Sequence, residues 1–251
     1  VTEAMLAAGV RPGDRVLELA CGPGGTGLAA ADVVGPDGEV VLSDVVLEML
    51  GIAAQRAAAR QLGNITIAQV DMENIAFPDA SFDAVLCREG LMLVIDPAAA
   101  LREAHRVLVP GGSAAFAVWG PRERNPWLSL LLDEVSARLG VPVPPPGMPD
   151  PFGLAEHGNL EELLGAAGFD DVVISEVATP MAVSTFDEWW SIVPALAGPV
   201  RPVLDAQPPE VIAAVQSQIE AAIGQFRSDA GGFEIPGLSF LACGQRRGHR
   251  I

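Results

Sequence analysis

The feature of this chain that most constrains its fold is a regular alternation in the first 120 residues. Short apolar runs rich in β-branched residues alternate there with amphipathic helical stretches. This alternation is typical of βαβ units, in which parallel strands form one sheet and the connecting helices cover both of its faces. Strands are expected near Arg15–Leu19, Glu39–Ser43, Ile65–Gln69, Ala84–Cys87 and Ala114–Val118, and helices near Thr26–Val34, Leu47–Gln61 and Ala98–Leu108.

The pattern changes after Gly120. A helical run, Trp127–Leu139, is followed by a proline-rich stretch, 141–151, which cannot join a central strand because proline lacks the backbone donor. Two further helical runs are expected at Phe186–Leu196 and Glu210–Phe226. We expect these helical insertions to form a cap over the strand ends.

Between and after the insertions the sequence returns to the sheet, with a helix at Leu160–Ala167 and strands at Val172–Val177 and Leu238–Cys243. The expected organisation is a core over 1–120, a cap insertion over 121–157, a core helix and strand over 158–183, a helical cap insertion over 184–230, and a last core strand with a tail over 231–251.

Composition narrows the class of partner. The chain carries 15 Lys and Arg against 32 Asp and Glu, a formal net charge of −17, and such a charge repels the phosphate backbone of nucleic acids. Its 3 cysteines are too few and too scattered for a disulfide framework, which favours free thiols in a reducing compartment, the cytoplasm. No apolar run is long enough for a membrane span, and no secretory leader pattern opens the chain. A predicted helix begins at Thr2, which leaves open a segment before Val1.

A glycine-rich loop follows the first predicted strand. Gly22, Gly24 and Gly27 match the spacing G-x-G-x-x-G between a strand and a helix. Such a loop lets the backbone approach a ligand and directs helix N–H groups at an anion, so a dinucleotide pyrophosphate is one candidate ligand.

Three carboxylates argue against a pyrophosphate. Glu18, Asp44 and Asp71 stand at the ends of the first three predicted strands, and in an open parallel sheet such ends converge on one crevice. A crevice with three acids suits a ligand that carries hydroxyls, an amine and a positive charge. Each acid also has a local alternative: Glu18 as a cap at Thr26, Asp44 as an N-cap of the next helix, and Asp71 as the start of a turn.

These residues resemble the class I S-adenosylmethionine-dependent methyltransferases, and within them the methyltransferase type 11 branch that includes ubiquinone and menaquinone biosynthesis methyltransferases. The resemblance rests on four motifs in order: Val16-Leu-Glu-Leu-Ala-Cys-Gly-Pro-Gly24, Asp44, Asp71-Met72, and Arg106-Val-Leu-Val-Pro-Gly-Gly112. It covers residues 11 to 120 well and the insertions hardly at all. It implies a Rossmann-like α/β fold, with seven mostly parallel strands, an antiparallel last strand, flanking helices and helical cap insertions.

The resemblance also implies a cofactor site for S-adenosyl-L-methionine, which leaves as S-adenosyl-L-homocysteine. In this family the motif positions divide between the methionine end, the ribose and the adenine of the cofactor. The residues carried over are Glu18, Ala20, Gly22 and Gly24 for the methionine part, Asp44 for the ribose hydroxyls, Val45, Asp71 and Met72 for the adenine, and Arg88 for the methionine end. Arginine is not typical at the last position, and alanine replaces a common glycine at position 20. The Arg106 motif is expected to be structural, and no metal-ligand spacing is present.

The acceptor is less constrained by the sequence. If it is a hydroxyl, a base would help, and the candidates are His157 and Glu89, with His105 more consistent with a helix surface. The expected pocket residues are Met92, Trp119, Met148 and Trp189, whose types suit a small apolar or aromatic acceptor. Trp189 could equally pack the cap.

The sequence therefore predicts a methyltransferase that acts on a small metabolite by direct displacement at the sulfonium. Two alternatives stay open: an NAD(P)-dependent oxidoreductase, and a non-catalytic S-adenosylmethionine-binding protein. The acceptor atom, the use of a base and the formation of a homodimer are not specified.

Overall fold

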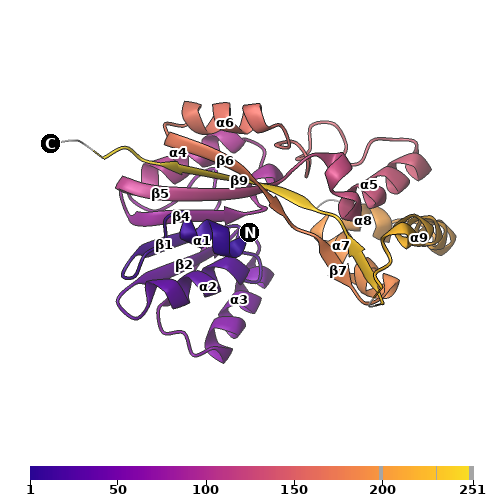
Figure 1. Cartoon of the computed structure of the whole chain (residues 1–251), viewed down its shortest axis with the longest axis horizontal. Coiled ribbons are helices and arrows are strands. Elements are labelled where there is room, and N and C mark those ends of the chain that lie inside the picture. Colours follow the sequence, from indigo (N-terminus) through magenta and orange to yellow (C-terminus); the bar gives the residue numbers. More distant parts are fainter. Residues whose placement is uncertain (198–199, 230, 249–251) are drawn as a thin grey trace. The chain divides into compact units, whose positions relative to one another are not determined.

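The computed structural model describes residues 1–197, 200–229 and 231–248. Its main feature is a seven-stranded sheet in the order β3-β2-β1-β4-β5-β9-β6, whose strands can be followed in Figure 1. The strands are β1 (Arg15–Leu19), β2 (Glu39–Asp44), β3 (Ile65–Gln69), β4 (Phe82–Arg88), β5 (Leu108–Trp119), β6 (Asp170–Ala178) and β9 (Leu238–Gln245). The expected Rossmann-like α/β class is confirmed.

The strands β3, β2, β1, β4 and β5 are parallel neighbours. The last strand runs the other way, because backbone bonds join Gly111 to Arg246 near the start of β5 and Gly120 to Leu238 near its end. The antiparallel last strand implied by the resemblance is therefore present.

Contacts divide the chain into two compact units. Unit 1 comprises 1–118, 156–176 and 240–251, and unit 2 comprises 119–155 and 177–239, so most of the two expected insertions falls within unit 2. The helices of unit 1 are α1 (Thr2–Ala7), α2 (Gly25–Val34), α3 (Leu47–Ala59), α4 (Pro97–Val107) and α6 (His157–Ala166), with a 3₁₀ turn η1 (Leu91–Leu93).

Two helix layers enclose the strands of unit 1. Helix α2 packs against β1 and β2, α3 packs against β2 and β3, and α4 packs against α6. Right-handed crossovers place helices on opposite faces on the two sides of β1, where the chain reverses its direction across the sheet. The central strands β1, β2 and β4 are mostly apolar because both of their faces are covered: Leu17, Val41 and Val85 are fully buried.

Arg106 fastens the loop before β4 to the end of α4. Its guanidinium donates to the carbonyls of Ile75 and Phe77, at 2.7 and 2.9 Å, and pairs with Glu103 and Asp79. These carboxylates raise the pKa of the Arg106 guanidinium above its usual range. The motif that begins at Arg106 thus has a structural role, as expected.

We expect Arg106→Met to lower the free energy of unfolding by about 1 to 2 kcal/mol, because it removes charge-assisted hydrogen bonds from a side chain that is largely covered. Urea unfolding followed by far-UV circular dichroism measures the change. The matched variant Arg102→Met loses only an exposed pair with Asp96 at 3.8 Å and should change the value by less than about 0.5 kcal/mol. Equal effects of the two variants would show that the Arg106 bonds add nothing.

Strand β5 begins earlier than the expected strand Ala114–Val118. Pro110-Gly111-Gly112 has the composition of a turn, but helix α4 is followed directly by β5 at Leu108. Gly111, at φ 89°, supplies a left-handed bend that side chains rarely adopt, and its N–H donates to the carbonyl of Arg246 at 2.7 Å. The turn residues therefore kink the strand.

Unit 2 contains the helices α5 (Pro126–Leu139), α7 (Phe186–Leu196), α8 (Val200–Asp205) and α9 (Pro209–Ile223), the 3₁₀ turns η2 (Arg122–Arg124) and η3 (Gly224–Phe226), and the strands β7 (Met181–Val183) and β8 (Phe233–Ile235). Helices α5 and α9 pack together, and β7 pairs with β8 in a separate two-stranded antiparallel sheet. Residues 181–183, which were expected in the core segment 158–183, pair with β8 in this small sheet.

Asn125 organises the start of α5. Its amide nitrogen donates to the carbonyls of Gly120, Pro121 and Leu238, and its oxygen accepts from Trp127 and from the Leu238 N–H. The sequence analysis did not identify this residue, although an asparagine before a proline that opens a helix marks such a position.

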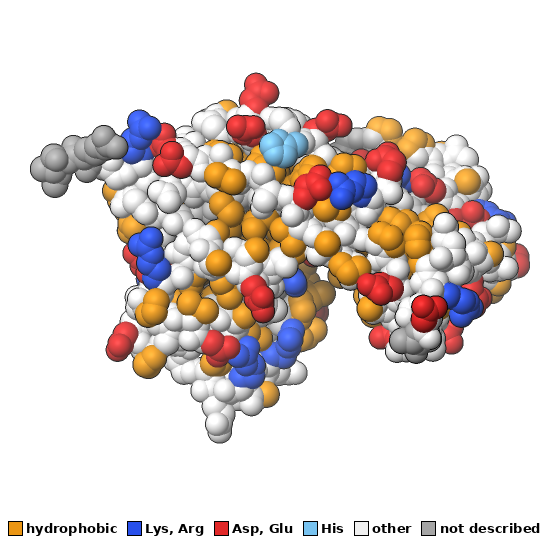
Figure 2. All heavy atoms as spheres, viewed as in Figure 1, with side chains coloured by type: hydrophobic (Ala, Val, Ile, Leu, Met, Phe, Trp, Pro, Cys, Tyr) orange, Lys and Arg blue, Asp and Glu red, His pale blue; other side chains and the backbone are white. Residues whose placement is uncertain are grey.

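Acidic side chains are scattered over the face of the molecule shown in Figure 2, rather than gathered in one patch. Glu18 and Asp44, at the carboxyl ends of β1 and β2, differ from these surface acids because they are buried.

Candidate active site at the carboxyl edge of the sheet

The carboxyl ends of β1 and β4 lie beside each other at the point where the strand order reverses. In open α/β sheets ligands bind at this point, because the loops that follow the two strands separate there. The residues predicted to hold a cofactor follow β1, β2, β3 and β4, so the topology brings all four groups to one edge.

Glu18 is fixed beneath the first turn of α2. The residue is 2% exposed, and its Oε2 accepts from the Gly27 N–H at 2.8 Å. Ser43 of β2 donates to the Glu18 carbonyl at 2.7 Å. Glu18 thus supports the glycine loop from below, which is close to the capping role considered from the sequence, and carboxylate lone pairs remain for other donors.

Burial dominates the ionisation of Glu18. It raises the pKa of the carboxyl to about 7, although the N–H groups of Gly27 and Thr26 and the positive charge of Arg88 act in the opposite direction. Near neutral pH this buried acid is therefore only partly ionised, and a cation placed beside it would favour its charged form.

Asp44 connects two loops. Its Oδ2 accepts from the Gly22 N–H at 2.9 Å, and its Oδ1 accepts from the Val46 N–H at 2.9 Å. The residue is 7% exposed. Val46, not Asp44, is the N-cap of α3, and it has no side-chain cap bond. Asp44 therefore fixes the glycine loop against β2, a role that the N-cap alternative does not include.

The glycine loop keeps one side open. Gly22 and Gly24 have φ values of 51° and 82°, in the left-handed region that favours glycine. A Cβ built on Gly22 would meet no heavy atom within 4 Å, so protein atoms leave that side free for a ligand. Ala20 also has a positive φ, 49°, at the position where the family commonly has glycine.

Gly90 was missed by the sequence analysis. A Cβ on Gly90 would lie 2.4 Å from the Cβ of Ala20 and 3.5 Å from the terminal methyl of Met72, so the loops after β1, β3 and β4 meet at this point. A side chain there would displace the glycine loop. The signal in the sequence is a glycine two residues after the end of the fourth strand.

The adenine-side predictions lie on the loops after β2 and β3. Asp71 is exposed, and its Oδ1 accepts from the Glu73 N–H at 2.9 Å, which is the turn considered as its local alternative. Met72 is 7% exposed and Val45 is 57% exposed. Val70 donates to the Asp44 carbonyl at 3.2 Å, which joins these two loops.

Arg88 ends β4 and extends toward the N-terminus of α2. Its Nη2 lies 3.2 Å from the position that a Cβ on Gly25 would occupy. The side chain is exposed, and its charge favours the ionised form of Glu18. Arg88 thus places one positive charge among the acids of this edge.

The candidate bases stand at different places. Glu89 is half-buried, with φ 57°, and its N–H donates to the Ala117 carbonyl at 2.7 Å. His157 is exposed at the start of α6, with its ring 5.9 Å from that of Phe240. His105 stands beside Phe169, with ring centroids 5.2 Å apart, and burial lowers its pKa.

The four predicted acceptor-pocket residues differ in exposure. Met92 is 3% exposed in unit 1. In unit 2, Trp119 packs edge-on against Trp127 with centroids 5.2 Å apart, and Met148 is 50% exposed. Trp189 is fully buried, stacks on Phe186 at 5.8 Å, and its Nε1 has no hydrogen-bond partner among the described residues. Trp189 therefore has the packing role that was its alternative, and a substrate contact by it stays a prediction.

Two cysteines lie near the acids. Cys21 and Cys87 are buried, and burial raises the pKa of both thiols, that of Cys87 to about 12. Thiols with such pKa values are protonated at neutral pH and are poor nucleophiles, so we assign no catalytic role to them.

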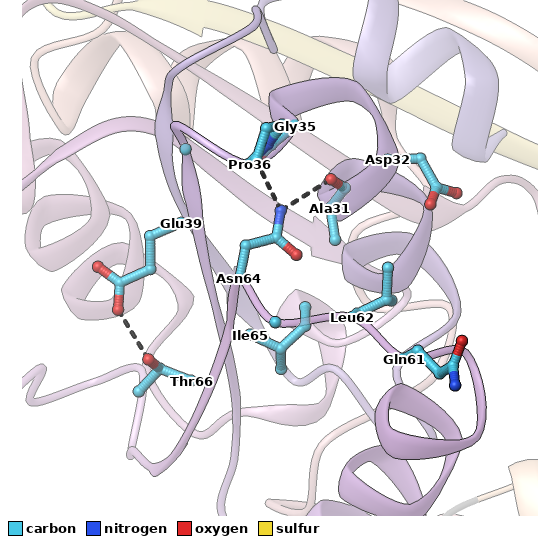
Figure 3. A pocket seen from close by; sticks show the side chains of 12 residues that line it. Ala31, Asp32, Gly35, Pro36, Glu39, Gln61, Leu62, Asn64, Ile65 and Thr66 are labelled. Carbon is cyan, nitrogen blue, oxygen red and sulfur yellow. Dashed lines mark hydrogen bonds between the residues drawn. The ribbon is translucent and has the colours of Figure 1, made fainter.

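A hollow of ≈ 660 Å³ lies at the opposite edge of the sheet, where β2 and β3 begin (Figure 3). Its polar groups are paired locally: Asn64 donates to the carbonyls of Ala31 and Gly35, and Thr66 donates to Glu39. Its lining does not include Glu18, Asp44, Asp71 or the glycine loop, so we do not assign the cofactor to it.

Within the described part of the chain, no helix has the length and apolar character that a membrane crossing requires. Within the same residues, no group of three or more potential ligand side chains could hold a metal ion.

Comparisons with known proteins match this organisation. A family model described as a methyltransferase domain matches residues 16–112. The ubiquinone/menaquinone biosynthesis C-methyltransferase UbiE of Cellvibrio japonicus is 38% identical over 134 residues, 53% of this chain and 53% of that protein. The chain spans about half the length of the curated relatives it matches.

Solved structures extend the likeness in fold to nearly the whole chain. The YcgJ protein from Bacillus subtilis has a TM-score of 0.63 at 20% identity, covering 98% of this chain and 97% of that one. A phosphoethanolamine N-methyltransferase from Haemonchus contortus, solved with S-adenosyl-L-methionine, has a TM-score of 0.61 at 18% identity, covering 98% and 52%. The resemblance to the ubiquinone and menaquinone branch is confirmed over the matched half of the chain, in which residues 16–112 match a methyltransferase domain.

Proposed function

We propose that this protein is an S-adenosyl-L-methionine-dependent methyltransferase that acts on a small apolar or aromatic metabolite. The observation that carries the proposal is the hydrogen bond from Gly22 to Asp44, which fixes an open glycine loop against a buried carboxylate at the strand reversal. The match of residues 16–112 to a methyltransferase domain supports it.

The residues at this edge fit the cofactor in chemical type. Asp44 would accept from the two ribose hydroxyls, and Asp71 from the adenine amino group, through lone pairs that their backbone bonds leave over. Val45 offers an exposed apolar side chain to the adenine face, next to Met72. Glu18 and the backbone of Ala20, Gly22 and Gly24 would hold the methionine part, with Arg88 beside them.

Methyl transfer demands little acid or base chemistry from the protein. When bound, S-adenosyl-L-methionine supplies an electrophilic methyl group on a positive sulfonium. The residues of the chain align the acceptor and exclude water, because most of the rate gain comes from orientation in a dry site. Glu89 and His157 are our candidates to take a proton if the acceptor is a hydroxyl.

The acceptor class is proposed from two considerations. The named relatives are C-methyltransferases of ubiquinone and menaquinone biosynthesis, and these names point to quinone precursors as acceptors. The proposed pocket residues Met92, Trp119, Met148 and Trp189 are apolar or aromatic. The family match ends at residue 112, before unit 2 begins, so the acceptor of the relatives is not carried over unchanged.

Location and assembly follow as parts of the same proposal. We propose a cytoplasmic enzyme with a small-molecule acceptor and no nucleic-acid partner, on the basis of its free thiols and acidic charge. Size-exclusion chromatography with light scattering would decide between a monomer and a homodimer.

A turnover assay tests the proposed activity. The protein is incubated with S-adenosyl-L-methionine and a panel of quinols, phenols, amines, thiols and aliphatic acids, and both S-adenosylhomocysteine and methylated product are measured by mass spectrometry. We expect turnover with at least one aromatic acceptor. Cofactor binding without turnover on any panel member would favour a non-catalytic binding protein.

A further inference from the structure

We propose that the guanidinium of Arg88 binds the carboxylate of the cofactor's methionine part and makes the site selective for a ligand that carries this group. The inference rests on the proposed function and adds a role for a side chain that the family pattern does not specify. It concerns unit 1 alone.

The first argument is position. Arg88 is the last residue of β4, the strand that pairs with β1 at the reversal of strand order. Its side chain extends over the first residue of α2, with Nη2 3.2 Å from the position of a Cβ on Gly25. The guanidinium therefore lies over the loop that the cofactor's methionine part would approach.

The second argument is the lack of a fixed partner. Arg56 donates to the Pro23 carbonyl, Arg60 pairs with Asp32, and Arg106 is held by two carboxylates. Among the described residues, Arg88 makes neither a hydrogen bond nor an ion pair, and its interaction with Glu18 is an electrostatic one. An exposed guanidinium has five donors in a planar fork that matches a carboxylate.

The third argument is charge complementarity. The edge carries Glu18, Asp44 and Asp71, so a ligand with only positive and neutral groups would need no arginine there. The methionine part of the cofactor is a zwitterion, with an ammonium that suits acids and a carboxylate that does not. Arg88 supplies the positive charge that this carboxylate requires.

Binding measurements on two ligands isolate the effect. S-adenosylhomocysteine and its decarboxylated analogue share the adenosine, the thioether and the ammonium, so the ratio of their affinities reports the carboxylate. We expect the wild-type protein to prefer S-adenosylhomocysteine by about tenfold to hundredfold, as charge-assisted bonds provide. We expect Arg88→Gln to reduce the preference to about threefold or less, while the analogue binds as before.

Any change that Arg88→Gln causes in the ionisation of Glu18 affects both ligands and cancels in the ratio. Arg88→Lys retains the charge without the planar fork and should keep an intermediate preference. Arg102→Gln removes an arginine on α4 and should keep the full preference. Circular dichroism verifies that each variant is folded.

A full preference in Arg88→Gln, or an equal loss of affinity for both ligands, would overturn the inference, because the side chain would then be idle or structural. Wild-type protein that binds neither ligand would contradict the proposed function itself. Wild-type protein that binds both equally would overturn the inference and leave the proposed function intact.

Discussion

The variant Asp44→Ala is expected to bind S-adenosylhomocysteine at least about tenfold more weakly than the wild-type protein, as the loss of a buried hydrogen-bonding carboxylate requires. Two effects act together. The substitution removes the proposed acceptor of the ribose hydroxyls, and it releases the N–H groups of Gly22 and Val46 that Asp44 holds at 2.9 Å. Isothermal titration calorimetry measures the affinity directly.

Two control variants separate the general loss of a negative charge from the loss of the Asp44 carboxylate itself. Asp37→Ala removes an exposed acid in the turn before β2, at the opposite edge of the sheet, and should leave the affinity unchanged. Asp44→Asn keeps one carbonyl acceptor and should lie between Asp44→Ala and the wild type. If Asp44→Ala binds as tightly as Asp37→Ala, Asp44 does not contact the ligand.

The variant Glu18→Gln is expected to make the ligand-free protein more stable than the wild type above pH 7, by roughly 3 kcal/mol. The pKa of Glu18 is raised from 4.5 to about 7. Between these values the folded state keeps a proton that the unfolded state releases, so wild-type stability falls as pH rises from about 4.5 to 7. Glutamine retains an acceptor for the Gly27 N–H and does not ionise.

The measurement is the difference in free energy of unfolding between Glu18→Gln and the wild type at pH 5 and pH 8. The charged and thiol groups around the carboxyl, Arg88, Asp44, Cys21 and Cys87, are common to both proteins, so their contributions cancel to first order. We expect a small difference at pH 5 and the full difference at pH 8. A difference that does not vary with pH would show that Glu18 keeps an ordinary pKa.

The probe must report on the unit that contains Glu18. All 4 tryptophans, Trp119, Trp127, Trp189 and Trp190, belong to unit 2, so tryptophan fluorescence follows the wrong unit. Far-UV circular dichroism or hydrogen exchange of the β1 and β4 amides follows unit 1. Coincident curves from both probes would license a two-state analysis.

The strands of the parallel half were predictable because their pattern is local. Ile65–Gln69 was predicted with the bounds that the structure has, and Glu39–Ser43 fell one residue short. Glu39–Ser43 belongs to a strand buried on both faces, which is a continuous apolar run between breakers. Ile65–Gln69 is an edge strand, marked by its β-branched residues after the turn residues Gly63-Asn64. Phe186–Leu196 was also predicted with its observed bounds, because an acidic first turn follows Thr185, which caps the helix.

The elements that were missed are short or depend on distant pairing. The strands 181–183 and 233–235 have three residues each, too few to show a period, and they form only because each pairs with the other. The helix 200–205 has six residues, which are also too few to show a helical period. Pro110-Gly111-Gly112 carries the signal of a turn, but pairing with Arg246 keeps it within a strand.

The site was predictable as a set of positions and not as a set of bonds. Strand ends placed Glu18, Asp44 and Asp71 at one edge, because parallel topology alone does this. The bond between Asp44 and Gly22, the support of Gly27 by Glu18, and the reach of Arg88 over Gly25 depend on tertiary packing. The periodicity of the sequence does not specify which side chains form these contacts.

The proposed cofactor site is tested most directly by a calorimetric titration of the wild-type protein with S-adenosylhomocysteine and, separately, with NADH. We expect micromolar-range binding of S-adenosylhomocysteine, corresponding to about −8 kcal/mol, and no binding of NADH. Binding of NADH alone, or of neither ligand, would contradict the proposed site and leave the glycine loop as a generic strand-to-helix turn.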